Sequence, residues 1–265
     1  PRRGLFGLDL GSIWAHRELL LVFARRDIQV LYKQAALGAG WAIIQPLFAV
    51  AIFTIVFGMF AKVPSDGIPY PIFAFAGVLP WTYFAEATRR ASTGLVDDAE
   101  LIRKVYFPRL IMPLAKVTAP LLDFCISCVV MIGLMLAYGI VPSFKILLIF
   151  PLVLVATLLA LSISLWLGPI NVRFRDIKHT VPFMLQVWMY ASPIVYPLSQ
   201  VPAEYKVLYS LNPMVGVIEG FRWAVFDRGS PDFVALGMSL GIIALLLVGG
   251  LVYFKKQERQ FADVI

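Results

Sequence analysis

The sequence predicts an all-α membrane protein that crosses the bilayer six times, with both ends in the cytoplasm. Of the 265 residues, 60% are hydrophobic and only 15% are charged, whereas a soluble domain carries roughly 25% charged residues. Six apolar stretches are long enough to cross the roughly 30 Å of hydrocarbon in a bilayer as helices. The basic residues gather between alternate stretches, which is typical of the cytoplasmic side.

The six predicted spans follow one another along the chain, and several contain proline, which membrane helices tolerate better than soluble ones. The sixth contains Gly237 and Gly241 in a G-x-x-x-G pattern, a signal for close helix packing. The third contains Cys125 and Cys128 as C-x-x-C, which favours small-residue packing over a redox pair because the motif lies inside an apolar helix. The predicted spans are residues 38–61, 70–88, 112–138, 146–169, 181–198 and 233–254.

The distribution of basic residues predicts the orientation of these spans. Five of the 23 Lys and Arg residues lie on the outer side, and Lys116 lies near the inner end of the third span. The formal net charge of +7 does not indicate nucleic-acid binding, because it is divided among short clusters rather than gathered on one polar face. The other 17 basic residues lie in segments 1–37, 89–111, 170–180 and 255–265, which we therefore place inside.

Residues 12–36, before the first span, are predicted to form an amphipathic helix in the cytoplasmic interface. Apolar residues such as Leu20 and Phe23 lie near one face of this helix, and Arg25 and Arg26 lie mostly on the other. The alternative is a soluble helical tail.

Residues 94–107, between the second and third spans, carry more apolar and aromatic side chains than a simple linker needs. Composition leaves two interpretations open: a short amphipathic helix that docks on a partner, or an interfacial anchor of aromatic and basic residues. The candidate docking residues are Asp97, Asp98, Glu100, Leu101, Ile102, Arg103, Lys104 and Phe107.

Residues 199–232, on the outer side, are too apolar for a solvated loop and are predicted to form two short helices that dip back into the outer leaflet. Asn212 is a good N-cap, and Pro213 suits the first helical position. Glu219 and Arg222 are three residues apart and can pair on a helix, which lowers the cost of a charge at that depth. The hairpin is predicted to gate or support an exit path, with an interfacial cap as the alternative.

The sequence lacks the motifs of the common enzyme sites. It contains no G-x-x-x-x-G-K-[ST] for nucleotide binding, and no G-x-S-x-G or H-E-x-x-H. His16 and His179 are the only histidines, so no His-based metal site or acid–base cluster can be built. Arg173 and Arg175 belong to a short basic loop whose plainest interpretation is that it sets topology.

Two kinds of side chain within the spans could contribute to transport. Asp123 is the clearest ionisable residue at depth, and it either bonds to a neighbouring helix or handles substrate or protons. Aromatic residues near the span ends form interfacial belts or line a path on which sugar rings stack. The candidates for such a path are Trp41, Trp81, Tyr83, Trp188 and Tyr190.

Several short motifs also occur in a specific order along nearly the whole chain. They are Arg26-Asp27 with Tyr32, Leu37-Gly38 with Trp41 and Pro46, Leu101-Ile102-Arg103-Lys104-Val105-Tyr106-Phe107-Pro108-Arg109, Asn171-Val172-Arg173-Phe174-Arg175-Asp176, Ser192-Pro193-Ile194-Val195-Tyr196-Pro197, Leu211-Asn212-Pro213-Met214 and Glu219-Gly220-Phe221-Arg222. This order resembles the ABC-2 type permeases, in the branch that exports lipid-linked polysaccharides such as O-antigen or teichoic acid.

The resemblance implies one transmembrane domain over residues 1–265, in the cytoplasmic (inner) membrane of a bacterium. It implies a homodimer bound to two copies of a separate P-loop ATPase, which holds ATP and Mg and leaves no cofactor on this chain. The implied cargo is an undecaprenyl-pyrophosphate-linked glycan. Residues 94–107 correspond to the coupling helix, residues 12–36 to the gate helix and residues 199–232 to the periplasmic gate.

The resemblance also assigns roles to individual residues. Trp41 and Trp188 are expected near the path, beside a lateral gate formed by the first and fifth spans. The expected cytoplasmic gate and headgroup residues are Arg25, Arg26, Asp27, Arg173 and Arg175. The expected periplasmic gate residues are Tyr196, Asn212, Glu219 and Arg222.

Three other functions compete with this one. An ABC-2 exporter of a drug or a lipid would use the same residue types. A secondary transporter would usually show inverted repeats and ion-coupling residues at the midplane, and no convincing repeat is present. A membrane-embedded enzyme would need a convergent acid–base or metal set. The sequence offers only two histidines and the single Asp123 at depth, which argues against such an enzyme.

Overall fold

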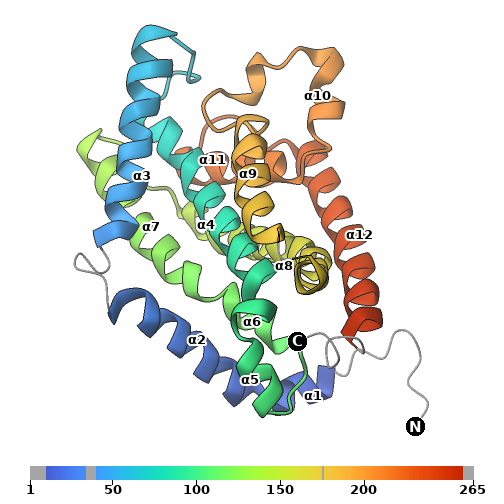
Figure 1. The fold of residues 1–265 in the computed structure, drawn as a ribbon. Helices are drawn as coiled ribbons and strands as arrows, with labels where there is room; N and C mark the ends of the chain where they lie inside the picture. Colours follow the sequence, from blue (N-terminus) through green and yellow to red (C-terminus); the bar gives the residue numbers. More distant parts are fainter. Residues whose placement is uncertain (1–9, 34–39, 175, 259–265) are drawn as a thin grey trace.

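The computed structural model describes residues 10–33, 40–174 and 176–258, and every regular element in these ranges is a helix (Figure 1). The predicted all-α fold is therefore confirmed. In chain order the elements are α1 (Leu10–Ala15), α2 (Arg17–Lys33), α3 (Gly40–Phe53), the π-helix η1 (Thr54–Phe60), α4 (Tyr70–Asp97), α5 (Ala99–Lys104), α6 (Ile111–Lys116), α7 (Ala119–Ala137), the 3-10 turn η2 (Phe144–Leu148), α8 (Ile149–Arg173), α9 (Ile177–Tyr190), the 3-10 turn η3 (Leu198–Gln200), α10 (Ala203–Tyr209), α11 (Pro213–Phe226) and α12 (Phe233–Glu258).

Four helical stretches of the described chain are long and apolar enough to cross a membrane, at the positions of the first, third, fourth and sixth predicted spans. At the second predicted span, α4 has 28 residues, but its Tyr, Trp and Pro residues make it less apolar. At the fifth, α9 has only 14 residues, which is about 21 Å of helix. The four stretches are Gly40–Phe60, Ile111–Ala137, Phe144–Arg173 and Phe233–Glu258.

The third predicted span is two helices rather than one. α6 ends at Lys116 and α7 begins at Ala119. Pro120 has no backbone N–H, and its ring crowds the carbonyl one turn earlier, so a straight helix cannot continue through this point. Thr118 donates its hydroxyl to the carbonyl of Ala115 at 2.6 Å, which satisfies one backbone group at the break.

The fifth predicted span is shorter than expected, because α9 ends at Tyr190. Residues 191–197 follow as irregular chain, so the prediction of a continuous helix to residue 198 is wrong. Pro193 and Pro197 explain the end, since proline lacks an N–H and disfavours the helical conformation in the residue before it. The apolar composition of residues 181–198 gives no sign that the helix ends at Tyr190.

Helix α4 forms the centre of the bundle and packs against α8, α7, α11 and α3 (Figure 1). α12 packs along α8, where a Cβ on Gly250 would lie 3.1 Å from the carbonyl oxygen of Ser162. By contrast, nothing lies within 4 Å of a Cβ built on Gly237 or Gly241. The packing predicted from that G-x-x-x-G pattern is therefore not made within the described chain.

The helix α3 and its continuation η1 lie at the edge of the bundle and expose a long apolar face. Phe48, Ile52 and Met59 are exposed, whereas Pro46 and Val50 are buried. Such a face is unfavourable in water and suits lipid or another protein surface.

Close packing of α11 on α12 gives a first testable prediction. A Cβ on Gly216 would lie 2.8 Å from the carbonyl oxygen of Ala235 and from Cα of Leu236. Because backbone atoms cannot move aside cheaply, Gly216→Ala is expected to lower the free energy of unfolding by about 1–3 kcal/mol. Thermal unfolding in detergent measures this effect. The matched control is Gly237→Ala on the open side of α12, which is expected to leave stability unchanged or slightly raised.

Candidate functional site

Different short helices lie at the two ends of the bundle. α1, α2 and α5 lie together at one end, drawn at the bottom of Figure 1, and α10 lies at the other. We refer to them as the α2 end and the α10 end. Arg26 and Asp27 of α2 and the docking segment 94–107, which contains α5, lie at the α2 end, and the residues assigned to the periplasmic gate lie at the α10 end.

The segment 94–107 contains the end of α4, the short helix α5 and an extended stretch from Val105. Two of its predicted docking residues, Ile102 and Phe107, are buried. The ring of Phe107 packs edge-on against Phe23 of α2, with 5.3 Å between ring centroids. These two side chains therefore hold the segment on the protein rather than present it to a partner.

The outward side of this segment, which we name the exposed α5 face, includes two residues that the sequence analysis did not select. Val105 is exposed, and Tyr106 is 96% exposed. Composition marked the whole run 101–107 as apolar and aromatic, but it could not distinguish inward from outward side chains. The exposed α5 face consists of Glu100, Arg103, Lys104, Val105 and Tyr106.

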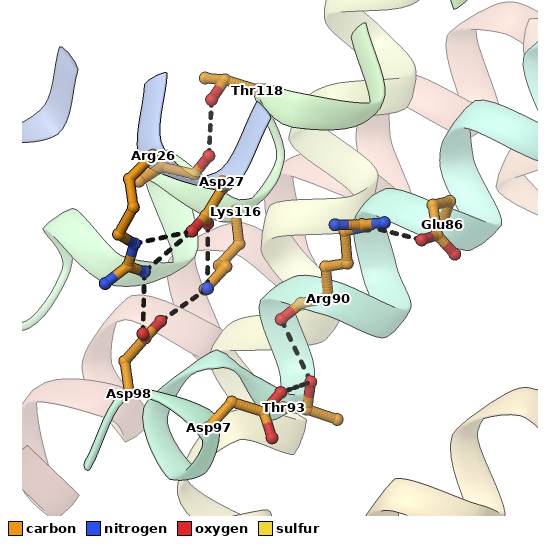
Figure 2. Close-up of polar contacts among 10 residues, drawn as sticks. Arg26, Asp27, Glu86, Arg90, Thr93, Asp97, Asp98, Lys116 and Thr118 are labelled. Carbon is orange, nitrogen blue, oxygen red and sulfur yellow. Dashed lines mark hydrogen bonds and ion pairs between the residues drawn. The ribbon is translucent and has the colours of Figure 1, made fainter. Parts of the chain in front are cut away.

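Beside this face, two carboxylates and two cations form a closed ring of ion pairs, which Figure 2 shows. One Asp27 oxygen lies 2.8 Å from Arg26, and the other lies 2.9 Å from Lys116. One Asp98 oxygen likewise lies 2.8 Å from Arg26, and the other lies 2.6 Å from Lys116. Each carboxylate therefore contacts both cations, and the four formal charges cancel. We refer to Arg26, Asp27, Asp98 and Lys116 as the ion-pair ring.

The ion-pair ring joins three separate parts of the chain. Arg26 and Asp27 come from α2, Asp98 lies between α4 and α5, and Lys116 ends α6. The side chains of Asp27, Asp98 and Lys116 are 8%, 14% and 14% exposed, so bulk water screens the ring only partly.

The space beside Gly94 and the charges around Arg26 both favour this ring. A Cβ on Gly94 would lie 2.8 Å from Cγ of Lys116, so the absence of a side chain there makes room for the lysine stem. Burial alone would lower the pKa of Arg26, but the carboxylates of Asp27 and Asp98 outweigh it and raise that pKa above its ordinary value.

The predicted cytoplasmic gate residues do not all meet. Arg26 and Asp27 join the ring, whereas Arg25 is exposed on α2 and Arg173 is exposed at the end of α8. Arg175 lies outside the described residues. The sequence predicted only that Lys116 lies near the inner end of the third span and gave it no role. In the structure, its charge and that of Arg26 balance the two carboxylates of the ring.

Asp123 forms a hydrogen bond with a neighbouring helix. The hydroxyl of Tyr32, on α2, donates to the Asp123 carboxylate on α7. One turn further along α7, the Ser127 hydroxyl donates to the Ala42 carbonyl of α3 at 3.1 Å. Of the two roles that the sequence left open, this geometry supports the structural one.

The candidate path residues divide into buried and exposed groups. Trp81 and Tyr83 are buried within the chain. Tyr83 shares a 2.6 Å hydrogen bond with the Thr157 hydroxyl. Trp41 and Tyr190, on α3 and α9, are exposed. A fifth candidate, Trp188, is partly buried, and its ring packs edge-on against that of Trp81.

At the α10 end, side chains from other helices clamp the post-α9 segment (residues 191–197). Asn212 donates from its amide nitrogen to the carbonyl of Ala191 at 3.0 Å. Tyr70 donates its hydroxyl to the carbonyl of Val195 at 2.7 Å. These bonds satisfy backbone groups that an irregular segment cannot pair within itself.

Arg222 is the central member of this clamp and is only 5% exposed. Its guanidinium donates to the carbonyl of Ile194 at 2.7 Å and to that of Tyr196 at 3.4 Å. It also pairs with Glu219 at 2.9 Å and lies 3.7 Å from the ring centroid of Phe73. Burial raises the pKa of the Glu219 carboxyl, and the Arg222 charge opposes that rise without cancelling it.

The other predicted periplasmic gate residues also lie in this region. The Tyr196 hydroxyl is 2.6 Å from that of Tyr209 on α10. Asn212 caps α11 by accepting from the backbone N–H of Met214 at 3.0 Å, and it also accepts from the Trp188 indole at 2.9 Å. The structure therefore brings Tyr196, Asn212, Glu219 and Arg222 around one segment, as the sequence grouped them.

A shallow hollow of about 300 Å³ opens between α9 and α10. Its polar side chains Trp188, Tyr209 and Asn212 already bond to one another or to their neighbours, so its walls are mainly apolar. Within the described residues, no three His, Cys, Asp or Glu side chains are close enough to hold a metal ion.

Comparisons with known proteins cover both ends of the bundle. The family described as "ABC-2 type transporter" matches residues 18–226, from α2 to the end of α11. The O-antigen export system permease protein RfbA of Myxococcus xanthus is 29% identical over 257 residues, which cover 96% of this chain and 98% of the relative. A permease of the same name from Klebsiella pneumoniae is 27% identical over 94% of this chain and 95% of the relative. The polysialic acid transport protein KpsM of Escherichia coli is 28% identical over 90% of this chain and 93% of the relative.

Proposed function

This chain belongs to the ABC-2 type transporter family, and on that premise we propose that it is the membrane permease of a polysaccharide exporter. The observation that carries the proposal is the near full-length similarity to permeases named for O-antigen export and polysialic acid transport. The matched region contains the exposed α5 face, the ion-pair ring and the clamp at the α10 end.

In this proposal the chain crosses the inner membrane of a bacterium six times, with the α2 end in the cytoplasm. The four long apolar stretches supply four of the crossings. α4 and α9 supply the other two crossings. The irregular post-α9 segment completes the crossing that the short helix α9 begins. Hydrogen bonds to the backbone of that segment support this reading, because unpaired carbonyls are costly in lipid. Residues 199–232 then form the re-entrant hairpin at the outer surface.

The driving force comes from a separate ATPase, two copies of which bind a homodimer of this chain. ATP and Mg bind on those subunits. The exposed α5 face is the docking surface, and it exposes Tyr106 and Arg103, two residue types that are enriched in protein interfaces. Nucleotide-driven motion of the ATPase moves this face and thereby opens or closes the path between the two permease chains.

The cargo is a glycan linked to undecaprenyl pyrophosphate. Its apolar tail stays in lipid beside the apolar face of α3, and its sugars pass along exposed aromatic residues such as Trp41 and Tyr190. Exposed Arg25 and Arg173 attract the negative headgroup at the inner surface. The glycan leaves at the α10 end beside the clamped segment.

Removing ATP hydrolysis tests this function directly. The chain is purified under gentle conditions, and a P-loop ATPase is expected to co-purify in equal amount. In inverted vesicles, uptake of radiolabelled lipid-linked glycan is expected to require ATP. Uptake is expected to fall to background when the catalytic glutamate of that ATPase is replaced by glutamine. Undiminished glycan uptake with the disabled ATPase would contradict the proposal, and vesicles without this chain provide the control.

A further inference from the structure

We infer that the ion-pair ring transmits the motion of the docked ATPase to α2, so that the ATPase moves α2 as well as the membrane spans. This inference rests on the proposed function, because it assumes that the ATPase binds at the exposed α5 face. It assigns a positioning role to Lys116 and Asp98, which neither touch the cargo nor belong to the exposed α5 face.

α2 meets the segment 94–107 through contacts between side chains. α2 packs mainly on α6 and α7. Its link to the segment 94–107 includes the Arg26–Asp98 ion pair and the packing of Phe23 on Phe107, within an apolar cluster that also contains Leu19, Leu20, Leu101 and Ile102. A displacement of α5 therefore reaches α2 through a small number of identifiable contacts.

The geometry of the ring supports this role. Every carboxylate oxygen lies 2.6 to 2.9 Å from a cation, and Arg26 and Lys116 are each shared by both carboxylates, so the four charges form one closed unit rather than separate pairs. Ion pairs that are exposed contribute little to holding two elements together. Arg26 is 35% exposed, but the other three members are largely shielded from water, so loss of Lys116 leaves an uncompensated charge in a partly buried place.

The position of Lys116 supports the same role. It ends α6, and its stem passes over Gly94 of α4. One side chain thus connects α6 and the end of α4 to the carboxylates of α2 and of the α4–α5 junction (Figure 2). This cross-connection makes α2 and the segment 94–107 move as one body.

The test separates holding the fold from transmitting motion. Lys116→Met keeps the length of the apolar stem but removes the cation, and leaves the ring with one excess negative charge. The double variant Asp98→Asn with Lys116→Met restores neutrality, because Arg26 still pairs with Asp27. A purely structural ring predicts that the neutral double variant works like the native protein. Our inference predicts that it folds and assembles normally but still fails to transmit motion.

Two measurements are made on the whole permease–ATPase complex in lipid vesicles. The first is the amount of glycan exported per ATP hydrolysed, expected to fall by about fivefold or more in both variants, a size typical of coupling between two sites. The second is hydrogen–deuterium exchange of residues 17–33 with and without ATP. In the native complex, ATP is expected to change exchange in this helix. In both variants, that response is expected to disappear while exchange in residues 99–104 still responds.

Lys145→Met is the matched control, because Lys145 in η2 pairs with Asp227 after α11, and both side chains are exposed and lie outside the ion-pair ring. It is expected to leave both measurements unchanged. Native coupling and a native α2 response in the neutral double variant would overturn the inference. The proposed function fails in a different way: the native complex itself would show no ATP-dependent glycan export.

Discussion

Arg222→Met is expected to lower the free energy of unfolding by about 3–5 kcal/mol. Arg222 is almost fully buried, and its guanidinium holds the carbonyls of Ile194 and Tyr196 while it pairs with Glu219. Methionine fills similar space but offers no donor. The substitution therefore leaves two backbone acceptors without that donor and a partly buried carboxylate without its cation.

Thermal or denaturant unfolding in detergent measures this loss. Replacing both partners, as Arg222→Met with Glu219→Gln, removes the unpaired charge and is expected to recover part of the stability. A double variant as unstable as the single one would show that the lost carbonyl bonds, rather than the stranded carboxylate, dominate the effect.

The single variant is also expected to depend on pH in a defined direction. Burial already raises the pKa of Glu219, and removal of Arg222 takes away the charge that opposes this rise. Between the ordinary pKa of a glutamate and the raised value, the folded state holds a proton that the unfolded chain has released. The free energy of unfolding of Arg222→Met therefore falls as pH rises through that window, and unfolding curves at several pH values check this sign.

Tyr106→Ala is expected to weaken binding of the ATPase subunit by about 2 kcal/mol, roughly thirtyfold in Kd. Tyr106 is nearly fully exposed in the isolated chain, so the folded chain loses little when it is truncated. Tyrosines that are exposed in the free protein and buried in a complex often carry much of the binding energy. ATP-dependent glycan export is expected to fall in parallel when the ATPase is limiting.

Titration of the purified permease with the ATPase subunit measures this Kd. Tyr138→Ala is the matched control, since Tyr138 is also exposed but lies at the end of α7 away from α5. If Tyr106→Ala bound the ATPase with native affinity, the exposed α5 face would not be the docking surface. Equal weakening in both variants would indicate a general effect of tyrosine loss.

The two variants act at opposite ends of the proposed route. Arg222 is buried and holds the irregular post-α9 segment, whose prolines prevent it from forming a helix. Tyr106 lies on the surface and is exposed to solvent in the isolated chain. Stability measurements are therefore expected to separate them: Arg222→Met lowers the unfolding temperature, and Tyr106→Ala leaves it unchanged.

Much of the candidate site follows from local sequence signals. The pairing of Glu219 with Arg222 and the cap at Asn212 depend on residues two or three apart, and both contacts are present. The predicted docking segment contains the exposed α5 face. Two of the predicted docking residues, Ile102 and Phe107, are buried against neighbouring helices, and composition alone does not distinguish them from the exposed residues of the segment.

The sequence by itself determined the all-α fold and four long apolar helices, because length and hydropathy are properties of a continuous stretch of chain. It also marked the basic segments and the missing nucleotide-binding motif. Only the tertiary structure decided that Lys116 completes a ring with Arg26, Asp27 and Asp98. Only the tertiary structure decided, too, that Arg222 supports the backbone where α9 stops. Both arrangements join segments far apart in the chain, and their contacts exist only once the helices between them have packed.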